Sequence, residues 1–264
     1  MIQKKHLYSF INIQKNWKSF QLLSNNQPFK PFKRVYHHHL MKTGGTSINK
    51  MFLSLTKSNE DLYTKLMRSN DKRIIEDKFV FSAWNHIIIA SGLFHYAWSH
   101  RPFENVLIPS NTFIISSFRN PYDRIYSRYK HLVNDLKNGL MPKNNMDEYK
   151  RLGNNFDDYL ENIPEQELCH QLYMFSKQLN VREAMKNLKK VNYIIDLNTF
   201  EHDILQLNKI LNIDLVSVHA RENRIAQPIS FNLEDAFSNV PKIFQKEIEF
   251  YTSVLDYKNS KSGV

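Results

Sequence analysis

Cysteine, glycine and long apolar runs are scarce in this sequence of 264 residues. Its single cysteine, Cys169, excludes an internal disulfide and any cysteine-rich zinc module, and it favours a reducing compartment. No run approaches the roughly 18 consecutive apolar residues that a membrane helix needs. These absences predict a cytoplasmic protein without a transmembrane segment, and a chain of this length suits one hydrophobic core.

Acidic residues are missing from the front of the chain, where Glu60 is the first. Residues 1–59 carry ten lysines and arginines, and the other 26 basic residues are matched by 26 acidic ones, so the net charge of +10 lies at the front. This distribution fits two interpretations, a solvated tail and a positive field that attracts an anionic ligand. We expect residues 1–32 to form a basic N-terminal extension and residues 33–264 to form a single domain.

Three segments have the pattern of a strand, a loop and an amphipathic helix. The strands are FKRVYHHHLM, TFIISSFR and NYIIDL, and each precedes a segment with apolar residues at helical spacing. In the second unit, Asn120 is a suitable N-cap and Pro121 suits the first helical position. The repeated units predict an α/β fold of three layers, with a central parallel sheet flanked by helices, in which ligands bind beyond the carboxyl ends of the strands.

The loop KTGGTS joins the first strand to its helix and has the features of an anion site. Gly44 and Gly45 allow close approach of the backbone, the N–H groups of the following helix point at the loop, and Lys42 adds a full positive charge. The Walker pattern G-x-x-x-x-G-K-[ST] of nucleotide triphosphate loops is not met. The loop therefore predicts a phosphate or sulfate site, with an ordinary Gly-Gly turn as the alternative.

A second set of anion-binding residues follows the second strand. Arg119 ends this strand, and Arg124, Ser127 and Arg128 are spaced by three and four residues along the next helix, so they share one face. A guanidinium at a strand end and a hydroxyl on the next helix can grip one phosphate group. The alternative is a solvated arginine stripe, which suits Arg119 poorly because Arg119 interrupts an apolar strand.

The two loops together resemble a pair of motifs from one enzyme family. KTGGTS after a histidine-containing strand resembles the loop H-x-P-K-T-G-G-T-S that holds the 5′-phosphosulfate in the Golgi-type and bacterial carbohydrate sulfotransferases. RNPYDRIYSRYKHL resembles the 3′-phosphate motif of that family, R-x-P-x-x-R-x-x-S-x-Y, and the two motifs occur in the family's order. His39 takes the place of the family's strand-end histidine, whereas Met41 replaces its proline.

The resemblance implies a P-loop-like sulfotransferase domain that uses 3′-phosphoadenosine 5′-phosphosulfate (PAPS) as co-substrate and needs no metal. Lys42 would neutralise charge on the bridging oxygen as the sulfuryl group leaves. Arg119 and Ser127 would hold the 3′-phosphate, with Arg124 and Arg224 as further contacts. The 5′-phosphate would be held by backbone and hydroxyl groups of the segment Thr43, Gly44, Gly45, Thr46 and Ser47.

Transfer to a hydroxyl needs a base, and histidine suits this role near neutral pH. The segment SGLFHYAWSH lies between the two motifs, where the resembling family often places its base. The resemblance therefore favours His95 as the catalytic base, with His100 and His86 as alternatives.

Two other segments resemble parts of the same family. HARENRIAQP stands where related enzymes send a late loop over the nucleotide, which implies contacts from Arg221, Asn223 and Arg224, although an ordinary basic loop fits as well. In LCHQLY, His170 and Gln171 resemble a segment that faces the acceptor.

Three functions remain open. The first is sulfuryl transfer from PAPS to a hydroxyl, where the resemblance favours a carbohydrate acceptor in the cytoplasm rather than the Golgi lumen, and the positive charge favours an anionic one. The second is a small-molecule kinase that needs magnesium and ATP, and the third is a polyanion-binding protein without catalysis. Nucleic acid is not an expected partner. His37 and His39 share one face of their strand, but no acidic or cysteine partner stands near them, so no metal site is predicted.

Overall fold

A computed structural model describes residues 2–140, 146–216, 237 and 240–262. The strands are β1 (Arg34–His38), β2 (Arg73–Glu76), β3 (Phe79–Ala83), β4 (Tyr96–Ser99), β5 (Thr112–Phe118) and β6 (Tyr193–Asp196). The helices before β5 are α1 (Ile2–Asn25), α2 (Gly45–Leu53), α3 (Leu62–Arg68), α4 (His86–Ser91) and the 3-10 turn η1 (Phe103–Asn105). Those after it are α5 (Pro121–Lys137), α6 (Met146–Lys150), α7 (Phe156–Asn162), α8 (Glu165–Leu168), α9 (His170–Phe175), α10 (Val181–Leu188), η3 (Leu197–Thr199), α11 (Phe200–Leu211) and α13 (Phe244–Ser262).

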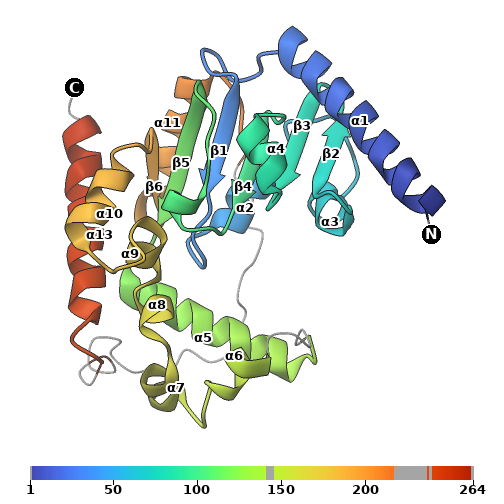
Figure 1. The fold of residues 1–264 in the computed structure, drawn as a ribbon. Helices are drawn as coiled ribbons and strands as arrows, with labels where there is room; N and C mark the ends of the chain where they lie inside the picture. The colour runs from blue at the N-terminus through green and yellow to red at the C-terminus, as the bar shows by residue number, and fades with distance from the viewer. Residues whose placement is uncertain (1, 141–145, 217–236, 238–239, 263–264) are drawn as a thin grey trace.

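Strand β1 lies inside a six-stranded sheet of order β2-β3-β4-β1-β5-β6. The strands β3, β4, β1, β5 and β6 are parallel, and β2 joins β3 at the edge in antiparallel orientation. After β1 the chain builds one side of the sheet and then crosses to β5 on the other side. The loops after β1 and β5 therefore flank the point at which the strand order reverses, the usual place for a ligand in such sheets. Helices α5 to α8 lie beyond this edge, below the sheet in Figure 1.

Successive apolar side chains along each central strand point to opposite faces of the sheet, so both faces are covered. Tyr36 of β1 packs in one buried cluster with α5, α9, α10 and α13, whereas the preceding Val35 packs in a second cluster with α2, α3 and α11. Ile114 and Ile115 of β5 divide between the two clusters in the same way. The central strands are thus buried on both faces, which confirms the predicted three-layer α/β fold with a mainly parallel sheet.

The expected start of α5 is confirmed at Asn120 and Pro121. The side chain of Asn120 accepts a hydrogen bond from the N–H of Tyr122 at 3.0 Å, and Pro121 occupies the first position of the helix. Because this cap fixes where α5 begins, it also fixes which residues of the first two turns face the end of β5.

The N-terminal segment 1–32 contains helix α1, which lies along the β2 and β3 side of the sheet (Figure 1). The buried guanidinium of Arg73 on β2 donates to the Asn16 side chain at 2.7 Å and to the Ser19 hydroxyl at 3.3 Å, and Lys15 forms an ion pair with Asp71 at 3.3 Å. The second half of α1 is therefore docked on the domain. No helix in the described part of the chain is both long enough and apolar enough to span a membrane.

Candidate active site

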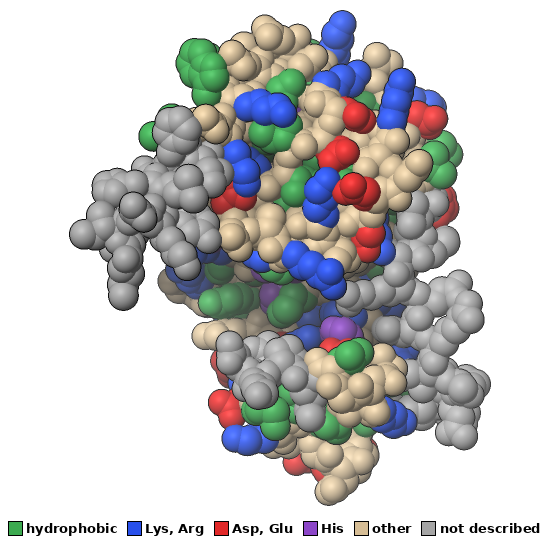
Figure 2. Space-filling view, turned by 90° about the vertical axis from the view of Figure 1, so that its right-hand side faces the viewer, with side chains coloured by type: hydrophobic (Ala, Val, Ile, Leu, Met, Phe, Trp, Pro, Cys, Tyr) green, Lys and Arg blue, Asp and Glu red, His purple; other side chains and the backbone are tan. Residues whose placement is uncertain are grey.

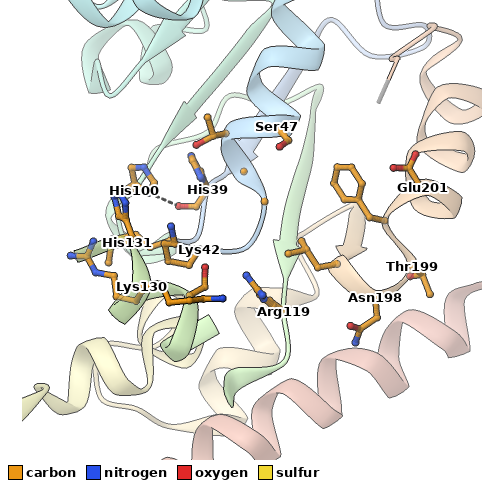
Figure 3. A pocket seen from close by; sticks show the side chains of 18 of the residues that line it. His39, Lys42, Ser47, His100, Arg119, Lys130, His131, Asn198, Thr199 and Glu201 are labelled. Carbon is orange, nitrogen blue, oxygen red and sulfur yellow. Dashed lines mark hydrogen bonds between the residues drawn. The ribbon is translucent and has the colours of Figure 1, made fainter. Parts of the chain in front are cut away.

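A cavity of about 1060 Å³ opens at the carboxyl edge of the sheet, among the loops after β1, β4, β5 and β6. Histidine and basic side chains gather in the hollow that crosses the middle of the face shown in Figure 2. Figure 3 shows the cavity with His39, Lys42 and His100 to one side of Arg119, and Asn198, Thr199 and Glu201 to the other. The lining residues are His39, Met41, Lys42, Gly44, Gly45, Thr46, Ser47, Tyr63, His100, Arg119, Ser127, Arg128, Lys130, His131, Leu197, Asn198, Thr199, Phe200, Glu201 and His202.

The loop between β1 and α2 has a backbone shaped for an anion. Gly44 is the N-cap residue of α2 with φ 78°, and Lys42 also has a positive φ, 67°. A lysine in this region of φ is strained, and such strain persists where the surrounding fold holds it. The first N–H groups of α2 lack partners within the helix, and the helix start carries a partial positive charge. The structure thus brings Lys42 and the start of α2 to one wall of the cavity.

Gly45 is required by the histidine that precedes the loop. A Cβ atom at this position would lie 2.0 Å from Cδ2 of His39, a distance that no side-chain packing tolerates. The His39 ring is buried, and its Nδ1 lies 3.3 Å from the Asn49 amide nitrogen, which keeps the ring against the loop. The His39 ring therefore occupies the space that a side chain at position 45 would need, so only glycine fits there.

We expect Gly45→Ala to lower the free energy of unfolding by about 1–3 kcal/mol, because the new methyl group must displace the His39 ring. Urea unfolding measures the change. In a His39→Ala background the same substitution should cost almost nothing, since the space is then open. An equal cost in both backgrounds would contradict the contact.

Thr43, in the predicted 5′-phosphate segment, and Met41, just before Lys42, make hydrogen bonds within the protein that support the loop. The Thr43 hydroxyl is buried, where it donates to the Leu40 carbonyl at 3.0 Å and lies 2.9 Å from the Ser117 hydroxyl, so it does not face the cavity. Met41 stands where the family pattern has proline, and its N–H donates to Nε2 of His170 at 3.1 Å. Methionine has a backbone N–H that proline lacks, and the buried imidazole of His170 accepts the hydrogen bond from it.

Arg119 lines the cavity, and the side-chain amide of Gln171 forms hydrogen bonds with both the backbone N–H and the backbone carbonyl of Arg119. The Arg119 N–H donates to Oε1 of Gln171 at 3.0 Å, and Nε2 of Gln171 donates to the Arg119 carbonyl at 3.0 Å. Glu247 of α13 supports Gln171 in turn, since it accepts from its backbone N–H at 3.1 Å. Among the described residues no hydrogen bond engages the Arg119 guanidinium, whose pKa is lowered by burial and raised by Asp123. His170 and Gln171 thus hold the two anion loops in place, whereas the sequence suggested that they face the acceptor.

The residues of α5 divide between the cavity and the core. Ser127 lines the cavity. Arg124 does not. Only 1% of it is exposed, and its Nη2 donates to the carbonyls of Glu167 and Leu168, both at 2.7 Å. The prediction that Arg124 binds the cofactor is therefore corrected, because its position in the first turn of α5 turns it toward α8. Arg128 does line the cavity, with ion pairs to Glu148 and Glu167.

The structure does not bring His95, the predicted base, to the cavity. His95 precedes β4, so it lies at the amino end of the strand, and its Nδ1 accepts the N–H of Val80 at 3.0 Å. His100 follows the same strand at its carboxyl end. At a rise of about 3.3 Å per residue the two histidines are about 16 Å apart. This placement corrects the assignment of His95, because a fully buried ring at the opposite edge cannot reach a ligand held by Lys42.

His100 has the geometry of a general base. Its Nδ1 lies 2.8 Å from the His39 carbonyl, which can only accept, so Nδ1 carries the proton and the other nitrogen of the neutral ring has the lone pair. The ring centroid is 4.1 Å from that of His39. Burial lowers the pKa of His100, the bond to the His39 carbonyl raises it, and the charge of Arg128 lowers it. The third alternative, His86, begins α4 and does not line the cavity.

Several lining residues have no counterpart in the sequence prediction. Lys130 and His131 come from the third turn of α5, and burial and the charge of Arg119 lower the pKa of Lys130. Asn198 and Glu201 follow β6. The third strand-helix unit was visible in the sequence, and the rule that ligands bind at carboxyl strand ends could have identified these last two residues.

The predicted contacts Arg221, Asn223 and Arg224 lie outside the described residues. The three-histidine segment is described in full, and His37 and His39 lie on one face, with stacked rings 5.0 Å apart. Nδ1 of His37 pairs with the Asn49 side chain at 2.8 Å. Among the described residues no group of three or more histidine, cysteine, aspartate or glutamate side chains could hold a metal ion.

No family model and no curated protein matches this chain. Among solved structures, a sulfotransferase from Alicyclobacillus acidocaldarius matches with 12% sequence identity and a TM-score of 0.36, over 86% of this chain and 94% of that chain. A match at this level carries no argument about function, which rests on the site.

Proposed function

We propose that the protein is a sulfotransferase that moves the sulfuryl group of PAPS to a hydroxyl of an acceptor. One observation carries the proposal. The loop with Lys42 and the start of α2, and the second site with Arg119 and Ser127, line one cavity. Two separate anion sites in one cavity fit a nucleotide with phosphate groups at both its 5′ and 3′ positions.

The donor residues fit such a ligand. The N–H groups at the start of α2, with the hydroxyls of Thr46 and Ser47, would hold the 5′-phosphate, while Arg119 and Ser127 would hold the 3′-phosphate. Leu197 and Phe200 add apolar surface between polar groups, which suits the base and ribose.

His100 and Lys42 would perform the transfer. PAPS supplies an activated sulfuryl group to this site. As the acceptor oxygen bonds to sulfur, the unprotonated nitrogen of His100 takes the hydroxyl proton, and Lys42 offsets the charge that develops on the departing oxygen of 3′,5′-bisphosphoadenosine. Both residues line the cavity.

Binding of 3′,5′-bisphosphoadenosine tests the proposal. We expect Arg119→Ala to weaken this binding about 10–150-fold, which corresponds to loss of a charge-assisted contact of about 1.5–3 kcal/mol. Isothermal titration calorimetry in the presence of EDTA measures the affinity. The control is Arg182→Ala, an exposed arginine of α10 outside the cavity.

Undiminished affinity in Arg119→Ala would overturn the assignment of the site. A kinase would instead bind ATP with magnesium in preference to the bisphosphate. Transfer of labelled sulfate from PAPS that persists in EDTA would support the sulfotransferase.

A further inference from the structure

Helix α1 presents an apolar face to solvent. Ile13, Trp17 and Phe20 are spaced by four and three residues, so they lie on one side of the helix, and they are 61%, 62% and 55% exposed. The rings of Trp17 and Phe20 stack on each other with their centroids 6.0 Å apart. Single exposed apolar side chains are common on proteins, but three neighbours on one helix form a continuous patch, and such patches mark interaction surfaces.

Another face of α1 is docked on the domain and fixes the rotation of the helix. Ser19 is fully buried, and Leu23 is nearly so. The buried guanidinium of Arg73 on β2 donates to the Ser19 hydroxyl and to the Asn16 side chain. The helix therefore lies along the outer edge of the sheet (Figure 1), and the side with Trp17 is turned away from the domain. Covering the apolar face takes a partner other than the described part of this chain.

The charge around this face is positive. Helix α1 contains four lysines and no acidic residue, and residues 1–59 contain ten basic residues and no acidic one. Of those ten, Lys42 alone lines the described cavity, so the candidate active site does not account for the others. Asp71, a carboxylate beside α1, is already engaged by Lys15 at 3.3 Å and by Arg73 at 3.1 Å. Lys18, which follows Trp17, is exposed and has no ion pair among the described residues.

An apolar face on a helix that carries lysines and no acidic residue is complementary to an anionic lipid surface. We infer that α1 binds in the interface of a bilayer that carries acidic headgroups. Ile13, Trp17 and Phe20 enter the boundary between headgroups and acyl chains, where the amphipathic indole ring is favoured. The lysines, Lys18 among them, face the phosphate and carboxylate groups of the lipids. The helix then lies in the plane of the bilayer and does not cross it.

A second copy of the chain suits this face less well. Pairing of two α1 helices through Ile13, Trp17 and Phe20 would bring the lysines of one copy near those of the other, and neither helix has a carboxylate to pair with them. The inference goes beyond the proposed function, because none of these three residues lines the cavity.

Binding to lipid vesicles tests the inference on the full-length protein. Vesicles of phosphatidylcholine alone are compared by co-sedimentation with vesicles of equal parts phosphatidylcholine and phosphatidylserine. We expect the anionic vesicles to bind at least about tenfold more tightly, because several lysines act together, and the difference should shrink as salt screens the headgroups. The tryptophan emission should shift to shorter wavelength on binding. Trp17→Phe, which keeps an apolar ring, should retain most of the binding but lose the shift.

Variants separate the apolar contribution from the charged one. The double variant with Trp17→Ser and Phe20→Ser should weaken binding to the anionic vesicles about tenfold or more, because the two rings no longer enter the lipid. Lys18→Glu should weaken binding to the anionic vesicles and leave the phosphatidylcholine vesicles unaffected. The melting temperature should not change, since these side chains are exposed. The control is Ile87→Ser on α4, where the apolar side chain is 83% exposed, and it should bind as the wild type does.

Other results would overturn the inference. Binding to neither kind of vesicle, or equal binding to both, would rule out an anionic lipid surface as the partner. Full binding by the double variant would place the contact elsewhere on the protein. A dimer in light scattering that the double variant loses, without any binding to vesicles, would assign the face to a second copy. The affinity for 3′,5′-bisphosphoadenosine should be the same in the wild type and the double variant, so the proposed function is tested separately.

Discussion

Replacing His100 with glutamine is expected to lower kcat for sulfuryl transfer about 10²–10⁴-fold, the usual contribution of a general base. Glutamine can still donate to the His39 carbonyl, which His100 contacts at 2.8 Å, but it cannot accept the acceptor's proton. Bisphosphate affinity should change little, because the anion sites are formed by other residues. Initial rates with saturating PAPS measure kcat.

The pH profile adds a second signature. His100 acts in its neutral form, and burial places its pKa below the ordinary value of 6.5. The rate should therefore be level above neutral pH and fall as acid protonates the ring, and this acid limb should vanish in His100→Gln.

His95→Gln is the informative control. It should lower the melting temperature, because His95 is buried and bonded to Val80, yet leave kcat of the folded protein within about threefold. Loss of kcat in His95→Gln with full activity in His100→Gln would return the base to His95.

The second large effect concerns acid stability. Burial lowers the pKa of His37 to about 3 and those of His38 and His95 to about 4. It also holds the pKa of His39 and of His170 well below 6.5. All five are neutral in the folded protein, while in the unfolded chain they protonate near pH 6.5. Unfolding therefore takes up protons, so acid favours it.

The size of this effect follows from linkage. Stability is fully present above about pH 6.5 and is lost as the pH falls toward 4, by about 1.4 kcal/mol per pH unit for each histidine. His37, His38 and His95 alone remove about 6 kcal/mol at pH 5, which is comparable to the stability of a typical domain. Burial raises the pKa of Glu247, so acid stabilises the folded protein through this residue. This single carboxyl group offsets only part of the loss that the buried histidines cause.

Thermal melts from pH 8 to pH 4.5, followed by circular dichroism, measure this loss. We expect the melting temperature to fall steeply below pH 6.5, and His95→Gln should show a shallower slope although it starts from a lower value. A melting temperature that stays constant between pH 7 and pH 5 would contradict buried neutral histidines.

The local parts of the fold were predictable from the sequence, because their signals lie within a few residues. Asn120 and Pro121 announce the start of α5, and the glycine pair marks the loop before α2. The order of the strands was not predictable in the same way, since pairing joins residues far apart, such as His37 with Trp98 and Ile115.

The misplacement of His95 and of Arg124 in the predicted site has physical causes. His95 was chosen from a motif without knowledge of strand direction. If YAWS is read as a strand, His100 stands at its carboxyl end, where ligands bind, and His95 at the wrong end. Arg124 shares a helix face with Ser127 and Arg128, but the packing of α8 against the first turn of α5 decides that it is buried. No periodicity in the sequence carries that information.

The bond between the Met41 N–H and His170 has a consequence for how this chain can diverge. Proline at position 41 would remove the donor and leave the imidazole of His170 buried without its partner, 129 residues away in the chain. Conversely, a substitution at position 170 that removes the acceptor would leave the backbone N–H of Met41 without a hydrogen-bond partner. The two positions are therefore epistatic, and each limits the substitutions that the other can accept, although no ligand need touch either of them.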